Sequence, residues 1–130
     1  MTEDYRAAAQ IDLDAVAFNI QSIQKKTKRR IIGLVKADAY GHGAVQVSRV
    51  LKEQGVDFFA VALVEEALQL RRAGITDPIL VLDYLAESQA QTAVEQGLRF
   101  SVFSRHAAQM ASRAAMAVGK PAYVHIKLDT

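Results

Sequence analysis

The chain has 130 residues, of which 51% are hydrophobic and 23% charged, and its formal net charge is +2 at pH 7. This composition is typical of one folded globular domain and argues against intrinsic disorder. The small positive charge does not indicate a nucleic-acid-binding protein. A chain without cysteine can form neither disulfide bonds nor thiolate metal sites.

The amino-terminal residues 1–6 are polar and lack the apolar centre of a signal peptide. The apolar runs of the chain are much shorter than the ~20 residues that a membrane-spanning helix needs. We therefore expect a cytoplasmic protein that binds neither a membrane nor nucleic acid.

The first predicted helix follows residues 11–13, which fit a short strand, and Asp14 is expected to be its N-cap. An apolar stripe at helical spacing supports this helix: Leu13, Val16, Ile20 and Ile23. The basic cluster at residues 25–30 is interpreted as cations that complement the carboxyl end of the helix. A phosphate or nucleic-acid site is the alternative interpretation of this cluster.

Five short segments rich in β-branched and aromatic residues are predicted to be strands: residues 31–35, 58–62, 78–82, 99–103 and 122–128. Helical patterns lie between them, and each ends at a glycine: residues 44–54, 65–73, 87–96 and 105–118. Continuous apolar runs and the repeated strand–helix unit predict an α/β fold with parallel strands. Five strands fit a doubly wound sheet or part of a barrel, and periodicity alone does not distinguish the two.

The segment 33–43 carries the strongest chemical signal, because an apolar strand runs directly into Lys36. The carboxyl ends of strands face the ligand in α/β folds, so Lys36 is expected at the ligand site. Gly41 and Gly43 follow in a loop, where they would let backbone N–H groups approach an anion. A lysine at this position could pair with a carboxylate, bind a phosphate, form a Schiff base or be purely structural. Spacing alone leaves these alternatives open.

Residues 35–43 read Val-Lys-Ala-Asp-Ala-Tyr-Gly-His-Gly. This segment closely resembles the motif by which alanine racemases attach pyridoxal 5′-phosphate (PLP), with Asp38 at a position where that family usually has asparagine. After Leu82 the chain has Asp83 and Tyr84, where the family often has glycine. Other segments resemble the family in the same order along the chain: residues 11–15, 59–62, 65–67, 70–75, 78–82, 119–121 and 124–130.

The resemblance implies that residues 1–130 are the N-terminal part of the PLP-binding barrel domain. The expected fold is therefore α/β, with repeated βα units and parallel strands in an incomplete (β/α)8 TIM-type barrel. The remaining barrel strands and the β-rich C-terminal domain of the family would lie outside this chain. Five strands cannot close a barrel and would leave sheet edges exposed.

By the same resemblance, Lys36 is the catalytic residue and holds PLP as a Schiff base, and Tyr40 is a further cofactor-binding residue that hydrogen-bonds the phosphate. Lys127 matches a family lysine that is often carbamylated, and a plain strand lysine paired with an acid is the alternative. His42 is expected to orient the backbone or face solvent, and His106 to face solvent. His125 is expected on the same side as Lys127, and no metal site is predicted.

The function implied is racemisation of L- and D-alanine, which would supply D-alanine for peptidoglycan. The family works as a homodimer in which a tyrosine of the partner subunit serves the opposite face of the substrate, so this chain alone is expected to be inactive. Two alternatives stay open. One is a non-catalytic, truncated PLP-binding fragment, and the other is a different barrel PLP enzyme, such as a broad-specificity amino-acid racemase or a decarboxylase.

Overall fold

The computed structural model describes residues 7–128, so the polar segment 1–6 and the last two residues of the family-like segment 124–130 lie outside the described residues. Helices and strands alternate along most of the described chain. Their bounds are α1 (Leu13–Thr27), β1 (Gly33–Leu34), α2 (Lys36–Gly41), α3 (Ala44–Glu53), β2 (Phe59–Val61), α4 (Val64–Arg72), β3 (Ile79–Val81), α5 (Glu87–Glu95), β4 (Arg99–Val102), α6 (Arg105–Val118) and β5 (Tyr123–Ile126). None of the helices within residues 7–128 is long and apolar enough to cross a membrane.

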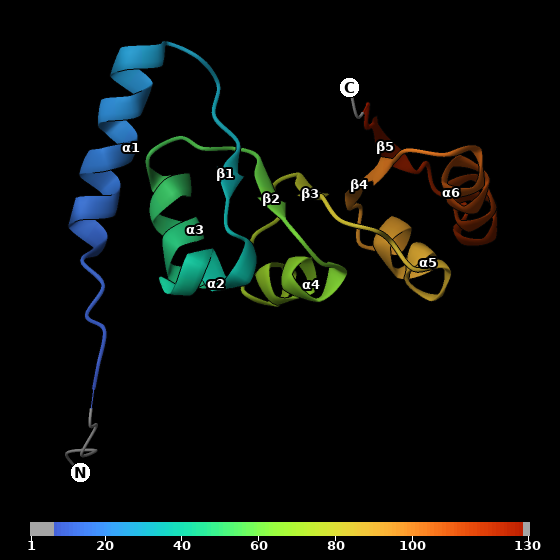
Figure 1. The fold of residues 1–130 in the computed structure, drawn as a ribbon, viewed down its shortest axis with the longest axis horizontal. Coiled ribbons are helices and arrows are strands. Elements are labelled where there is room, and N and C mark those ends of the chain that lie inside the picture. The colour runs from blue at the N-terminus through green and yellow to red at the C-terminus, as the bar shows by residue number, and fades with distance from the viewer. Residues whose placement is uncertain (1–6, 129–130) are drawn as a thin grey trace.

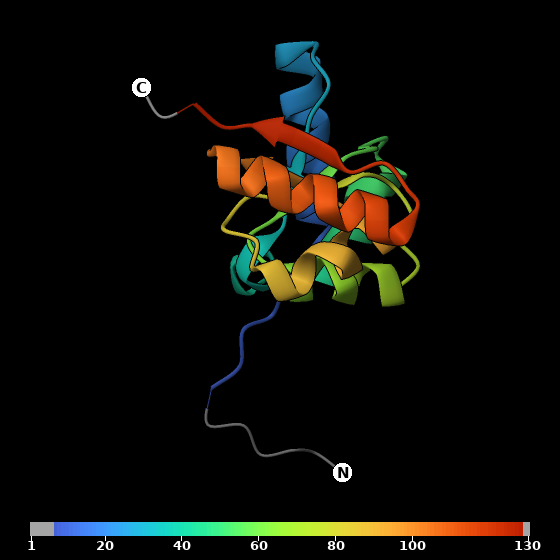
Figure 2. The ribbon, with the colours of Figure 1, turned by 90° about the vertical axis from the view of Figure 1, so that its right-hand side faces the viewer.

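The five strands pair in parallel, and their order in the sheet is their order in the chain, β1-β2-β3-β4-β5. A doubly wound sheet reverses its strand order at a switch point, whereas a barrel adds each strand beside the preceding one. The unbroken order therefore identifies the sheet as part of a (β/α) barrel. Figure 1 shows α3 to α6 in an arc outside the strands, and Figure 2 shows β5 as the outermost strand on the side of α6.

The core lies between the sheet and the helices, because alternate residues of each strand point toward the helices. Five of these strand residues have no exposed surface: Phe59, Val61, Ile79, Val81 and Phe100. The intervening residues face the interior of the incomplete barrel, where Leu34 is 40% and Tyr123 is 51% exposed. The concave face of the sheet is therefore open at both outer strands.

The predicted strands and helices are confirmed, with strands shorter than predicted and with α6 at its predicted bounds. The predicted start of α1 is wrong. Asp12 caps this helix by accepting the N–H of Ala15 at 3.0 Å, while Asp14 lies in the first turn. Residues 11–13 form no strand, because Leu13 already belongs to the apolar stripe of the helix. At the other end of α1, Lys25 and Lys26 lie in the last turn. This agrees with the interpretation that the basic cluster complements the carboxyl end of the helix.

Arg71 stabilises the turn between α4 and β3 through hydrogen bonds to backbone carbonyl oxygens. Its guanidinium donates to the carbonyl oxygens of Ile75 and Asp77, both at 2.8 Å, and to that of Gln96 at 3.2 Å. Burial lowers the pKa of Arg71, and the nearby carboxylate of Asp77 opposes this effect. These contacts tie the second βα unit to the third.

Candidate functional site

Lys36 lies just beyond the first strand: β1 ends at Leu34, and Val35 separates the strand from the lysine. Beyond β1 the pairing with β2 continues, because Val35 donates its N–H to the carbonyl oxygen of Ala60 at 2.9 Å. Gly33 permits the close packing on the outer face, since a Cβ there would lie 2.9 Å from the side chain of Leu51. Lys36 is half-buried and lies at the edge of the sheet where the parallel strands end.

The segment α2, which follows Lys36, is a left-handed turn. Ala37, Asp38, Ala39 and Tyr40 have φ between 50° and 55° and ψ between 40° and 48°. This conformation costs an L-residue about 1–2 kcal/mol, so the turn as a whole stores about 4–8 kcal/mol. The sequence indicated only a loop here, because alanine and tyrosine rarely adopt this conformation. Strained backbone of this kind clusters at functional sites, where the surrounding structure holds it in place.

Asp38 closes the turn onto the start of α3. Its carbonyl oxygen accepts the N–H of Gly43 at 2.9 Å, and its carboxylate Oδ1 accepts the N–H of Ala44 at 2.7 Å. An asparagine could accept the second bond through its side-chain oxygen. The departure from the usual family residue at this position therefore preserves the contact.

Three of the backbone N–H groups expected to approach an anion around Gly41 and Gly43 are already bonded within the turn. The N–H groups of Gly43 and Ala44 already donate to Asp38, and that of His42 donates to the carbonyl oxygen of Ala39 at 3.1 Å. These donors hold the turn together and are not available to a ligand.

Glu66 holds the other side of the turn, and sequence reasoning missed this residue. Its Oε1 accepts the N–H of Ala37 at 2.7 Å, and its Oε2 accepts the N–H groups of Ala62 at 2.8 Å and Leu63 at 3.0 Å. Glu66 is the third residue of α4, a position from which a carboxylate often reaches back to the N-cap. That position indicated a capping role, but the contact with the turn after Lys36 depends on the tertiary fold.

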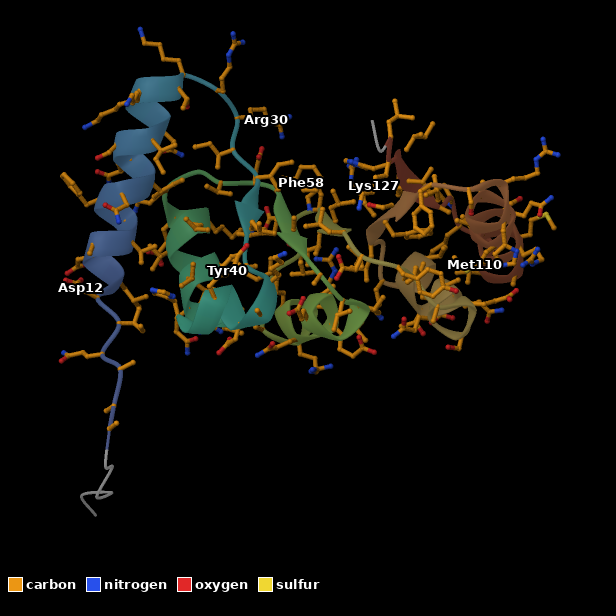
Figure 3. All side chains as sticks on the ribbon, viewed as in Figure 1. Asp12, Arg30, Tyr40, Phe58, Met110 and Lys127 are labelled. Atoms are coloured by element: carbon orange, nitrogen blue, oxygen red, sulfur yellow. The ribbon has the colours of Figure 1, made fainter. Side chains whose placement is uncertain are left out.

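Tyr40 is the last non-glycine residue of the left-handed turn, one turn after Lys36, and its side chain is 59% exposed (Figure 3). The neighbouring His42 has Nδ1 at 3.1 Å from the carbonyl oxygen of Ala39 and at 3.2 Å from that of Tyr40. Because carbonyl oxygens only accept, Nδ1 carries the proton in this arrangement. The His42 ring is exposed, and its contacts with these two carbonyl oxygens orient the backbone of the turn, as the sequence indicated.

Lys127 follows β5 and donates its backbone N–H to the carbonyl oxygen of Val102 at 2.9 Å, while its side chain is exposed (Figure 3). It lines an open cavity of about 810 Å³ beyond the carboxyl ends of β3, β4 and β5, with Leu82, Asp83, Tyr84, Phe103 and Leu128. A cavity of this size can hold a small organic ligand. Lys36 and Tyr40 do not line it, although they follow the first strand at the same edge of the sheet.

His125 is the third residue of β5 and precedes Lys127 by two positions. Its ring meets Phe58 edge-on at 6.1 Å, and the guanidinium of Arg99 lies over the rings of Phe58 at 5.3 Å and Tyr123 at 5.5 Å. This stack gives His125 a packing role on the concave face, away from the cavity beside Lys127. His106 is exposed in the first turn of α6, as expected.

The side chains of Lys36 and Tyr40 form no ion pair and no hydrogen bond with other groups in residues 7–128. The structure thus presents a primary amine and a phenol, one left-handed turn apart. Neither group has a polar partner within the described residues. Between residues 7 and 128 there is also no group of three or more acidic or histidine side chains that could hold a metal ion.

Comparison with known families gives a match over residues 11–130 to the model described as alanine racemase, N-terminal domain. Among curated relatives, the chain is 44% identical over 123 residues to alanine racemase 2 of Caldanaerobacter subterraneus subsp. tengcongensis, an alignment that covers 93% of this chain and 32% of the relative. The chain therefore spans about a third of the length of the curated relatives it matches.

Solved structures of amino-acid racemases also match this chain. The fold matches alanine racemase from Clostridium difficile 630 in complex with cycloserine with a TM-score of 0.88 and 39% identity, over 92% of this chain and 32% of that one. It also matches histidine racemase from Leuconostoc mesenteroides subsp. sake with a TM-score of 0.81 and 26% identity, over 88% of this chain and 31% of that one.

Proposed function

This chain belongs to the alanine racemase family, which is PLP-dependent, and we propose that it holds PLP through Lys36 and contributes this lysine to the interconversion of L- and D-alanine. The observation that carries the proposal is the position of Lys36, a half-buried amine at the end of a parallel strand, followed by a strained turn that ends at Tyr40. The order of the strands supports it, because barrel enzymes bind their ligands at this edge.

The residues present fit PLP in their chemistry. Lys36 supplies a primary amine that can condense with an aldehyde, with loss of water, and no carboxylate of the described chain competes for it. Tyr40 supplies an exposed phenolic hydroxyl that can donate to a phosphate oxygen. Bound PLP would withdraw electrons from the Cα–H bond of an amino acid.

Lys36 also has the chemistry of an acid–base group. With PLP and an amino acid bound, the Nζ of Lys36 would be placed to take a proton from one face of the substrate Cα or to return it. Racemisation needs a second group on the opposite face, and we propose that a partner subunit supplies it in a homodimer. The 130-residue chain on its own is then inactive, because its concave face is open and it carries one of the two bases.

Lys127 is the second lysine of the proposed site. It lies at the carboxyl edge of β5, beside the cavity of about 810 Å³. A carbamate on Nζ would turn this cation into an anion able to hold an arginine from elsewhere in the protein. The alternative is a plain amine paired with an acid, and Asp83 lines the same cavity. In either form Lys127 contributes charge at the mouth of the barrel.

The D-alanine that the proposed reaction produces would serve peptidoglycan synthesis.

A second candidate function is the racemisation of another amino acid. The structural match to a protein named histidine racemase supports this candidate, because that protein has a similar fold over 88% of this chain. The higher identity to proteins named alanine racemase favours alanine.

The proposal is tested by incubating the full chain with PLP, reducing with borohydride and locating the labelled peptide by mass spectrometry. We expect the label on Lys36 and its loss in Lys36→Ala. The matched control is Lys26→Ala, which removes an exposed lysine from α1 and should leave labelling unchanged. Labelling of another lysine in the unsubstituted protein would contradict the assignment. A substrate panel with both enantiomers of alanine and histidine then separates the two candidate functions.

A further inference from the structure

Glu66 makes one contact that helix capping does not require. A cap at the start of α4 needs only the bonds from Oε2 to the N–H groups of Ala62 and Leu63. The other oxygen, Oε1, reaches across to the segment that follows β1 and accepts the N–H of Ala37 at 2.7 Å, the shortest of the three bonds. One carboxylate therefore joins the carboxyl ends of two neighbouring strands.

The residue that Glu66 reaches is the one directly after Lys36 and the first of the left-handed turn. Ala37 has φ 50° and ψ 48°, a conformation that its methyl group disfavours. It is also exposed, so packing contributes little to holding it there. A hydrogen bond from a backbone N–H to a carboxylate is among the stronger ones in proteins, and it fixes the direction of the peptide group between Lys36 and Ala37.

We propose that Glu66 is a positioning residue for Lys36: it holds the peptide after the lysine in the left-handed conformation and so fixes the amine and the Tyr40 hydroxyl relative to each other. This inference rests on the proposed function. Without the bond from Ala37, the start of the turn can relax toward a less strained conformation. The Lys36 amine and the phosphate-binding phenol would then no longer meet the two ends of one PLP molecule.

Glu65 provides a matched control. It is the residue before Glu66, in the same first turn of α4, and it carries the same charge. Its Oε1 accepts a bond from the Gln89 side chain at 2.6 Å, and within residues 7–128 its side chain forms no hydrogen bond with the left-handed turn. Replacing Glu65 by glutamine removes an equal charge from the same helix end and leaves the turn untouched.

The experiment compares Glu66→Gln with Glu65→Gln in the full chain. It measures PLP affinity by the absorbance of the lysine-bound cofactor, the share of borohydride label on Lys36, and thermal unfolding. We expect Glu66→Gln to weaken PLP about tenfold or more, since an amide can keep only part of the three-bond arrangement and positioning errors of this kind are costly. We expect Glu65→Gln to stay within about twofold of the unsubstituted protein.

Two further readouts separate positioning from general stabilisation. The first is the ratio of the affinity for PLP to the affinity for pyridoxal, which lacks the phosphate. This ratio should fall in Glu66→Gln if the Lys36 amine and the Tyr40 phenol lose their relative placement. The second is rescue by Ala37→Gly, because glycine adopts the left-handed conformation without steric cost. The double variant Ala37→Gly with Glu66→Gln should recover part of the lost affinity.

The inference is overturned if Glu66→Gln binds PLP and labels Lys36 like the unsubstituted protein. It is also overturned if affinity falls only in proportion to thermal stability, with no change in preference and no rescue, since Glu66 would then be only a helix cap. Failure of the unsubstituted protein to label Lys36 refutes the proposed function, and the inference with it. Equal PLP affinity and equal labelling of Lys36 in the unsubstituted protein and in Glu66→Gln refute the inference alone.

Discussion

Ala37→Gly tests whether the turn after Lys36 is strained in the way the structure shows. Ala37 is exposed and has φ 50°, so its methyl group contributes strain and little packing. Removing the left-handed penalty gains about 1–2 kcal/mol, and the greater freedom of glycine in the unfolded chain costs about 0.4–1 kcal/mol. We therefore expect the free energy of unfolding to rise, by at most about 1.6 kcal/mol and by about 0.8 kcal/mol at the middle of the two ranges.

The matched control is Ala108→Gly, at an exposed position in the regular right-handed helix α6. There the same substitution should lower the free energy of unfolding by about 0.8–1 kcal/mol. Urea denaturation of the two variants, with circular dichroism as the signal, gives both values. Opposite signs support the left-handed turn, whereas a loss at Ala37 as large as that at Ala108 would refute the reasoning.

Three further predictions follow from single residues. Ser48 is fully buried on α3, and its hydroxyl has no hydrogen-bond partner in the described chain. Ser48→Ala should therefore raise the free energy of unfolding by about 1 kcal/mol in denaturant titrations. A lower free energy of unfolding would show that the hydroxyl has a partner. Arg71→Met leaves three carbonyl oxygens without their charged donor and should lower the free energy of unfolding by about 2 kcal/mol. The exposed neighbour serves as its control, because Arg72→Met should stay within about 0.5 kcal/mol, and equal losses would contradict the role of Arg71. With ¹³C-labelled bicarbonate, a carbamate signal should appear in NMR spectra and disappear in Lys127→Ala; a signal that survives this substitution excludes Lys127 as its source.

The fold could be predicted largely from the sequence, because the signals that define it are local. Buried strands appear as continuous apolar runs, and residues such as Gly74 and Gly119 mark helix ends by their positive φ. The choice between a doubly wound sheet and a barrel could not be made from periodicity. It depends on which strands pair, and pairing is a long-range property that the structure supplies through the unbroken strand order.

The site was predictable only in part. The position of Lys36 at the end of a strand followed from the apolar run before it, and its chemistry came from resemblance to a family motif. The left-handed turn was not predictable, since nothing in Ala37 or Ala39 favours positive φ. The role of Glu66 was missed for a related reason: the capping position on α4 is visible in the sequence, but its partner Ala37 lies 29 residues away.

The most direct test of the account is an experimental structure of the full chain with PLP bound. We expect continuous density between Lys36 Nζ and the aldehyde carbon of the cofactor, with the Tyr40 hydroxyl at hydrogen-bond distance from a phosphate oxygen. Cofactor attached to a different lysine, or a phosphate bound away from Tyr40, would contradict the account.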